Sequence, residues 1–122
     1  MVIFVLLGVK AVKKEYRIKK NKEIETLLSQ KKQVGNSSFS VYYSFNQKEP
    51  HFRFAISVPK KYGTAVDRNR IKRRIREVIK TANIREVVDF FIIVKIPAKL
   101  ANYEDIYKSL TNLFARAKII EG

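Results

Sequence analysis

The clearest pattern in the chain is an alternation of apolar and polar side chains, which is typical of strands with one buried face. It runs over residues 38–46, where Phe39 and Val41 would face the core, and again over 52–58. A third segment, 89–97, is apolar on both faces, which indicates a strand in the centre of a sheet. The pattern therefore predicts three strands.

Three other segments carry apolar positions at helical spacing. A short helix is predicted from Asn21 to about Lys32, a long one from about Thr64 to Ala82, and a last one beginning near Asn102. The element order is α-β-β-α-β-α, which predicts an α+β two-layer sandwich with the helices packed on one face of a mixed sheet. The long helix joins two strands in a βαβ crossover, which is right-handed on general grounds.

The first nine residues form an apolar run that is too short to span a bilayer, which needs about 20 apolar residues. It lacks the basic region and the small-residue cleavage site of a signal peptide. We interpret residues 1–12 as an extension of unknown role and 13–122 as a single domain. Either the extension covers an edge of the sheet or natural translation begins later; we favour the later start.

The composition excludes several classes of site. The 122 residues include no cysteine and one histidine, which excludes disulfides, thiolate metal sites, cysteine nucleophiles and multi-histidine metal centres. The 11 acidic residues are scattered singly, and no Ser, His and acid spacing stands out. We expect no catalytic residue and no cofactor bound by the protein side chains.

Charge is the strongest compositional signal. The chain has 26 basic and 11 acidic residues, a net charge of +15, and most of the excess lies in segments 10–22 and 60–80. Such an excess repels itself in a compact domain unless a polyanion is present. Nucleic acid is the favoured partner, and an anionic membrane surface is the weaker alternative.

A helical wheel of the long helix separates its buried side from its basic side. The buried side consists of Ile71, Ile75, Val78, Ile79 and Ala82. The stripe beside it consists of Asn69, Lys72, Arg73, Arg76 and Lys80, with Arg70 and Arg74 facing outward. Glu77 alone offsets these like charges along the stripe, so the helix is destabilised without a polyanion, and arginine suits phosphate through its planar fork.

Tyr42 is an aromatic residue among serines on the polar face of its strand. We expect it beside the strand 52–58, whose outward residues include Ala55 and Ser57. Small neighbours would leave room for a base to stack on the ring. The alternative is a tyrosine packed under a neighbouring helix, and the pattern does not separate the two.

These residues resemble a known family, the bacterial ribonuclease P protein component. The most specific part is the run RNRIKRRIRE at residues 68–77, preceded by SVPKKYGTAV at 57–66. Weaker similarities at 16–21, 39–42 and 89–98 keep the same order. The resemblance extends over roughly residues 13 to 119.

The resemblance implies a small basic RNA-binding subunit that assembles with a catalytic RNA, the ribonuclease P RNA. That enzyme removes the 5′ leader from precursor tRNA, and magnesium bound by the RNA performs the hydrolysis. The protein would be cytoplasmic, monomeric within the complex and independent of membranes. The family also implies a left-handed βαβ crossover, against the general rule.

Two sets of site residues follow from the resemblance. The implied RNA contacts are Arg68, Asn69, Arg70, Lys72, Arg73 and Arg76, with Lys60 and Lys61 in the preceding turn. The implied leader-binding residues are Tyr42, Arg17, Lys20, Ile24 and Leu28. The family usually has Phe at the positions of Ile24 and Leu28, and aliphatic side chains pack against a base without stacking on it.

Two other hypotheses are kept. One is a stand-alone RNA- or ribosome-binding protein on a similar fold. The other is a membrane-surface protein that uses the basic helix and the apolar amino terminus, although the apolar face of that helix is committed to a core.

Overall fold

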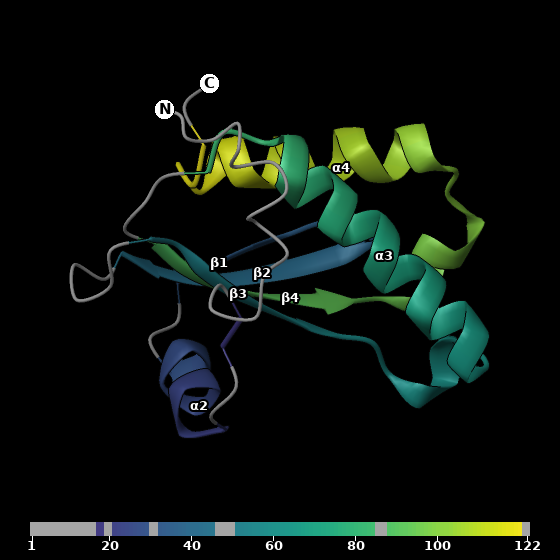
Figure 1. The fold of residues 1–122 in the computed structure, drawn as a ribbon, viewed down its shortest axis with the longest axis horizontal. Coiled ribbons are helices and arrows are strands. Elements are labelled where there is room, and N and C mark those ends of the chain that lie inside the picture. The colour runs from purple at the N-terminus through teal and green to yellow at the C-terminus, as the bar shows by residue number, and fades with distance from the viewer. Residues whose placement is uncertain (1–16, 19–20, 30–31, 46–50, 85–87, 121–122) are drawn as a thin grey trace.

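The structure is a computed structural model that describes residues 17–18, 21–29, 32–45, 51–84 and 88–120. One sheet runs through the domain, with helices on both of its faces (Figure 1). In chain order the elements are α2 (Asn21–Ser29), β1 (Gln33–Gly35), β2 (Phe39–Phe45), β3 (Arg53–Ser57), the 3₁₀ helix η2 (Lys60–Tyr62), α3 (Ala65–Thr81), β4 (Val88–Val94), the 3₁₀ helix η3 (Ile96–Leu100) and α4 (Tyr103–Arg116). The apolar amino terminus and Lys20 lie outside the described residues.

The sheet has the strand order β1-β2-β4-β3. β2 is antiparallel to both of its neighbours, whereas β3 is parallel to β4. The sheet is therefore mixed, as predicted, and β3, α3 and β4 form the βαβ unit. β4 lies between β2 and β3, which confirms the central place predicted from its two apolar faces.

The main core lies between the sheet and the pair α3 and α4, which cover the upper face in Figure 1. Aromatic side chains form its centre: the ring centroids of Phe54 and Phe90 are 5.9 Å apart, and Phe90 meets Phe114 edge to face at 5.4 Å. α3 contributes the residues predicted for its buried side, among which Ile71, Ile75, Val78 and Ile79 are fully or almost fully buried. That burial fixes which flanks of α3 remain for charged side chains.

α2 lies on the opposite face of the sheet, so the expectation that all helices pack on one face is wrong (Figure 1). Its Leu27 packs with Ile18 and Phe91 in a second, smaller cluster. The physical reason is that β4 carries apolar side chains on both of its faces. Phe91 points away from the main core, so its ring is buried only if another element packs on that face. The result is a three-layer arrangement within the predicted α+β class.

The chain between α2 and β2 differs from the prediction. The described part of α2 is Asn21–Ser29, Lys32 at the expected helix end is not helical, and the short strand β1 pairs Val34 with Val41. This strand falls where the sequence predicts a helix end and a turn. Local propensity is overridden here because β1 satisfies the hydrogen bonds of the edge of β2.

The start of α3 is fixed by a capping box formed by Thr64, where the helix is predicted to begin, and Asp67. The backbone N–H of Asp67 donates to the Thr64 hydroxyl, and the Asp67 carboxylate accepts the N–H of Thr64, each at 3.2 Å. Gly63 precedes the box, and a Cβ on it would lie 2.5 Å from Asp67 Oδ2. Glycine at this position therefore lets the cap close.

Candidate nucleic-acid interface

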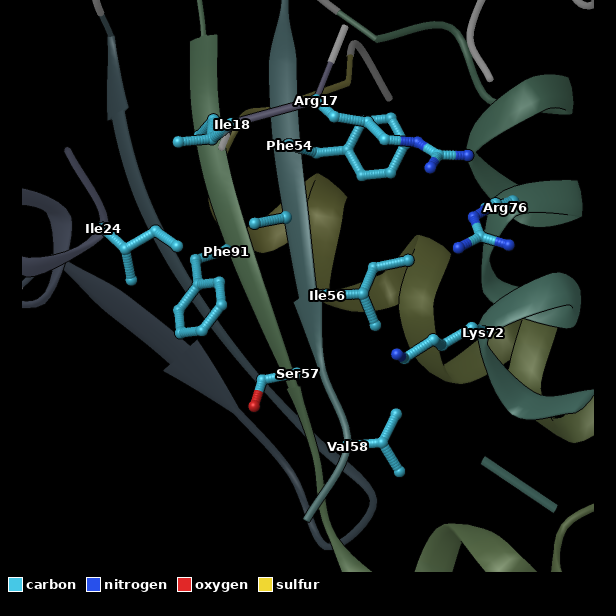
Figure 2. Close-up of a pocket in the computed structure, with 11 residues that line it drawn as sticks. Arg17, Ile18, Ile24, Phe54, Ile56, Ser57, Val58, Lys72, Arg76 and Phe91 are labelled. Atoms are coloured by element: carbon cyan, nitrogen blue, oxygen red, sulfur yellow. The ribbon is translucent and has the colours of Figure 1, made fainter. Parts of the chain in front are cut away.

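A cleft of about 460 Å³ opens along β3, one of the two edge strands of the described sheet, and extends to α3 (Figure 2). Phe54 and Ile56 of β3, with Val58 after it, form an apolar wall on the α3 side. Lys72 and Arg76 enter from α3. The lining continues around the edge of β3 to the face covered by α2, where Ala55, Ser57, Phe91 and Ile24 contribute.

Arg17 reaches the cleft because its segment pairs with the free edge of β3. Arg17 is bridged to Phe54 in a parallel sense, and the N–H of Ile18 donates to the Phe54 carbonyl at 2.8 Å. Successive side chains of an extended segment point to opposite sides. Ile18 is therefore buried under α2, while Arg17 extends toward α3, as Figure 2 shows.

The cleft concentrates positive charge. None of its described lining residues is acidic, and three of them, Arg17, Lys72 and Arg76, are basic. Burial lowers the pKa of Arg76 from its ordinary value, and the charges of Arg17 and Arg73 lower it further. The buried Nε of Arg17 has no hydrogen-bond partner in the described part of the chain. Such a group of donors can form strong charge-assisted hydrogen bonds to an anion such as phosphate.

The other predicted RNA contacts divide between the flanks of α3. Arg68 is four residues before Lys72, on the flank that faces the cleft, and its buried Nε has no hydrogen-bond partner among the described residues. Asn69 and Arg73 are exposed on the outer surface of the helix. Arg70 turns to the opposite flank, where it lines a separate hollow. Lys60 and Lys61, in η2, are exposed.

Tyr42 lies on the α2 face of the sheet, but its neighbour there is Phe91 of β4. The expectation that it lies beside β3 is wrong, because β4 is inserted between β2 and β3. Phe91 in turn pairs with Ala55, so a row of side chains runs from Tyr42 across the sheet to the cleft. Tyr42 is half-buried against the cluster under α2, which agrees with the packing alternative for part of the ring.

The remaining predicted leader residues behave differently from one another. Ile24 packs on the same cluster as Tyr42 and lines the cleft. Leu28 is 38% exposed, and the adjacent Leu27 takes the buried position. The structure therefore joins Arg17 and Ile24 to Lys72 and Arg76 in one cleft, although the sequence analysis places these pairs in two separate sets.

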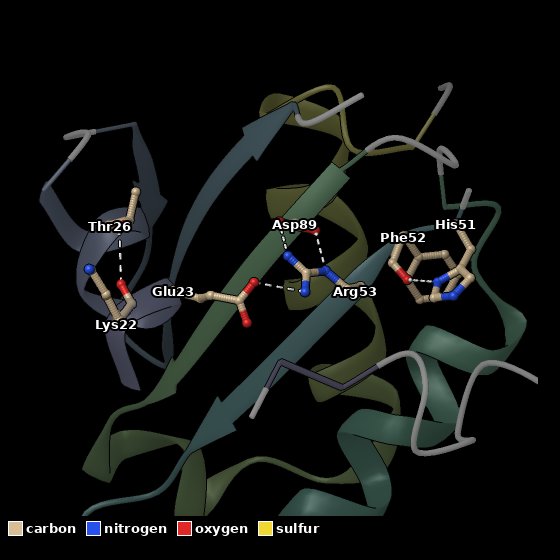
Figure 3. A network of polar contacts seen from close by, with 7 residues as sticks. All are labelled: Lys22, Glu23, Thr26, His51, Phe52, Arg53 and Asp89. Atoms are coloured by element: carbon tan, nitrogen blue, oxygen red, sulfur yellow. Dashed lines mark hydrogen bonds and ion pairs between the residues drawn. The ribbon is translucent and has the colours of Figure 1, made fainter. Parts of the chain in front are cut away.

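α2 is tied to the sheet by an ionic network that the sequence analysis missed (Figure 3). Arg53 of β3 binds Asp89 of β4 through two hydrogen bonds, of 3.2 and 2.8 Å, and its Nη1 lies 2.9 Å from Glu23 of α2. The hydrogen bond to Asp89 is the main factor that raises the pKa of Arg53 above its ordinary value. A local sequence pattern does not reveal this network, because Arg53 is 30 residues from Glu23 and 36 residues from Asp89 along the chain.

No three His, Cys, Asp or Glu side chains of the described residues come together as metal ligands would. The same residues contain no helix that is both long and apolar enough to cross a membrane.

Comparison with known proteins identifies the family. The family model for ribonuclease P matches residues 12–118. The chain belongs to the ribonuclease P protein family. It is 43% identical over 108 residues to the ribonuclease P protein component of Bacillus cereus (strain Q1), a match that covers 87% of this chain and 94% of the relative. The corresponding protein of Phytoplasma australiense is 37% identical over 111 residues, covering 89% and 96%.

A solved structure of the ribonuclease P protein of Staphylococcus aureus has the same fold, with a TM-score of 0.80 and 40% identity. The match covers 87% of this chain and 98% of that one. The resemblance seen in the sequence is thereby confirmed. The chain is a protein subunit of ribonuclease P, an endoribonuclease of tRNA processing, and its partner in that enzyme is the ribonuclease P RNA.

Proposed function

We propose that the protein holds the ribonuclease P RNA along α3 and the β3 cleft, and guides the 5′ leader of precursor tRNA over the face that carries Tyr42. The observation that carries this proposal is the convergence of Arg17, Lys72 and Arg76 in a cleft whose described lining includes no acid. Cations gathered without counter-charges favour a bound polyanion, since RNA phosphates relieve their mutual repulsion.

The two faces of the cleft suit different parts of an RNA chain. The α3 side offers guanidinium and ammonium groups that bind phosphates. The α2 side offers Phe91 and Ile24, which line the cleft, and Tyr42 beside Phe91, against which unpaired bases stack or pack. A single strand crossing the edge of β3 would meet both surfaces. Lys20 and Leu28 remain candidates for the same path.

The polypeptide contributes binding and positioning. Magnesium held by the RNA supplies the hydrolytic chemistry, and no protein side chain acts as acid, base or metal ligand. The RNA-binding domain comprises residues 13–122, acts as a monomer within the complex and works in the cytoplasm. The alternative of a stand-alone RNA-binding protein is not needed to explain any feature of the cleft.

Cleavage of precursor tRNA by a bacterial ribonuclease P RNA at low magnesium, with and without the protein, tests the proposal. We expect the protein to restore cleavage, because its cations relieve the repulsion between RNA chains that magnesium otherwise screens. Cleavage that is equal with and without the protein, at every magnesium concentration, would refute it.

The leader path has its own test in Tyr42→Ala. This change should weaken binding of precursor tRNA with a leader by about 1–3 kcal/mol, the value of one stacked base, and leave mature tRNA little affected. Tyr42→Phe keeps the ring and serves as the matched control. An equal loss for both substrates would mean that Tyr42 acts only in packing.

A further inference from the structure

A second, smaller hollow lies on the flank of α3 that faces away from the cleft. It has a volume of about 220 Å³ and lies between η2, α3 and η3. Its lining consists of Tyr62, Asp67, Arg70, Ile71, Arg74 and Lys99. None of these residues lines the cleft along β3, so the two cavities are separate.

The hollow brings together cations from distant parts of the chain. Arg70 and Arg74 are four residues apart and therefore lie on the same flank of α3. Lys99 comes from η3, and its Nζ lies 5.9 Å from the centre of the Tyr62 ring, within the range of a cation–π contact. Tyr62 is itself only 5% exposed, so it forms a fixed wall against which the lysine is held.

The charge of the hollow is not balanced by its own residues. Asp67 is its one acid, and that carboxylate already accepts the N–H of Thr64 in the capping box. This hydrogen bond is the main factor that lowers the pKa of Asp67, and Lys99 and Arg70 lower it further. Among the described residues, the four ion pairs within 4.0 Å involve none of Arg70, Arg74 and Lys99. The hollow therefore holds three cationic side chains and one carboxylate, and that carboxylate already accepts a hydrogen bond from the capping box.

We infer that this hollow binds a phosphate group of an RNA backbone, with Arg74 and Lys99 as the principal donors. The guanidinium fork of Arg74 suits two phosphate oxygens, and Lys99 supplies a point charge beside them. The volume is below the roughly 300–1,000 Å³ of pockets for drug-sized ligands, which suits a single phosphate. This inference rests on the proposed function and adds a second contact to it.

The hollow and the cleft lie on opposite flanks of α3, so an RNA that occupies both would contact the helix from two sides. A helix with its side chains is about 10–12 Å across, so its two flanks contact different points of an RNA. The flank with Lys72 and Arg76 serves the cleft, and the flank with Arg70 and Arg74 serves the hollow. α3 is then held from both sides, which fixes its rotation relative to the RNA.

The first test compares Arg74→Ala/Lys99→Ala with the wild type. It measures how the binding of ribonuclease P RNA and of precursor tRNA depends on salt. Loss of charge-assisted hydrogen bonds to one phosphate should weaken binding roughly 10- to 100-fold. The log–log slope against salt should become shallower by about 0.7–0.9. The matched control is Lys108→Ala/Arg116→Ala, which removes two exposed cations from α4 and should change neither quantity. Equal thermal unfolding of the variants verifies that the fold is kept.

A second test locates the RNA. Because the chain has no cysteine, Val66→Cys provides one attachment point for an iron–EDTA probe. Val66 is 64% exposed and is four residues before Arg70, on the same flank. In the assembled enzyme we expect backbone cleavage in a confined region that disappears when Arg74 and Lys99 are also replaced. Cleavage in the ribonuclease P RNA or in precursor tRNA identifies which molecule supplies the phosphate.

The outcomes separate this inference from the proposed function. Wild-type affinity and slope for both RNAs in the Arg74→Ala/Lys99→Ala variant would overturn the hollow as a phosphate site. Arg68→Ala/Lys72→Ala/Arg73→Ala should still weaken RNA binding in that case. If this triple variant also binds as the wild type does, the proposed function fails as well.

Discussion

Replacing Arg53 with Met should destabilise the protein far more than replacing Glu23 with Gln. Arg53 contacts two acids that differ in burial. Its bond with Asp89 joins side chains that are 14% and 9% exposed, at 2.8 Å, whereas Glu23, at 2.9 Å, is 36% exposed. Methionine keeps most of the aliphatic length of arginine, so the change removes the charge and its hydrogen bonds more than the packing.

The magnitudes follow from this difference in burial. Removing one partner of a buried ion pair costs about 3–5 kcal/mol, since the other charge is left in a poorly solvated site. An exposed pair contributes about 0–1 kcal/mol, because water and salt screen it. Arg53→Met should therefore cost at least about 3 kcal/mol and Glu23→Gln less than about 1 kcal/mol. The first is a large part of the 5–15 kcal/mol that stabilises a typical domain.

Urea unfolding of the free protein, followed by circular dichroism, measures both variants. With a slope of about 1–3 kcal/mol/M, Arg53→Met should lower the midpoint by roughly 1–3 M, and Glu23→Gln should shift it much less. Lys108→Met, on the exposed side of α4, is the control for loss of a surface cation. Small and equal shifts of the urea midpoint for Arg53→Met and Glu23→Gln would refute the conclusion that the ion pair of Arg53 with Asp89 stabilises the contact between β3 and β4.

Three further predictions concern the capping box of α3 and the amino-terminal segment. Gly63→Ala should cost about 0.5–2 kcal/mol or more, the value of an N-cap, because its Cβ would displace the Asp67 carboxylate. Part of the loss should remain when Asp67 is already alanine, because the new Cβ would still lie 2.9 Å from the Cβ of residue 67. The pKa of Asp67 is lowered in the folded state, so its contribution to stability is present above its ordinary pKa of 3.8 and is lost as the pH falls through the folded value. The melting temperature of the wild type should accordingly fall more steeply than that of Asp67→Asn below about pH 4. Deletion of residues 1–11 should leave thermal stability and precursor-tRNA processing unchanged, and a clear drop in melting temperature would show that this segment belongs to the folded domain.

Much of the local structure can be predicted from the sequence because it depends on neighbours along the chain. The alternation around Phe39 and Val41 and the helical spacing of Ile71 and Ile75 locate β2 and α3, since burial of one face is a periodic constraint. Thr64 marks the start of α3 through a hydrogen bond that spans only three residues. The basic flank of α3 follows from the same periodicity.

The placement of these elements depends on contacts between distant residues, which the pattern does not contain. The two apolar faces of β4 predict its central place, but not that it separates Tyr42 from Ala55. The pattern also does not reveal that α2 covers the second apolar face of β4, or that Leu27 and not Leu28 is the residue buried there.

The set of residues that line the cleft likewise depends on contacts between distant parts of the chain. Arg17 joins Lys72 and Arg76 because its segment pairs with the edge of β3. That pairing places a residue from before the first helix beside the middle of α3. The charges are evident in the sequence, whereas their convergence in one cavity requires the fold.

The salt dependence of ribonuclease P RNA binding by Arg17→Met/Arg76→Met, compared with wild type, tests directly whether the β3 cleft binds RNA. Methionine keeps the apolar length of both side chains in the cleft, so the fold should be retained. If each arginine neutralises one phosphate, the log–log slope should become shallower by about 1.4–1.8 and the affinity at moderate salt should fall. An unchanged slope and affinity would contradict the assignment of this cleft as the RNA-binding site.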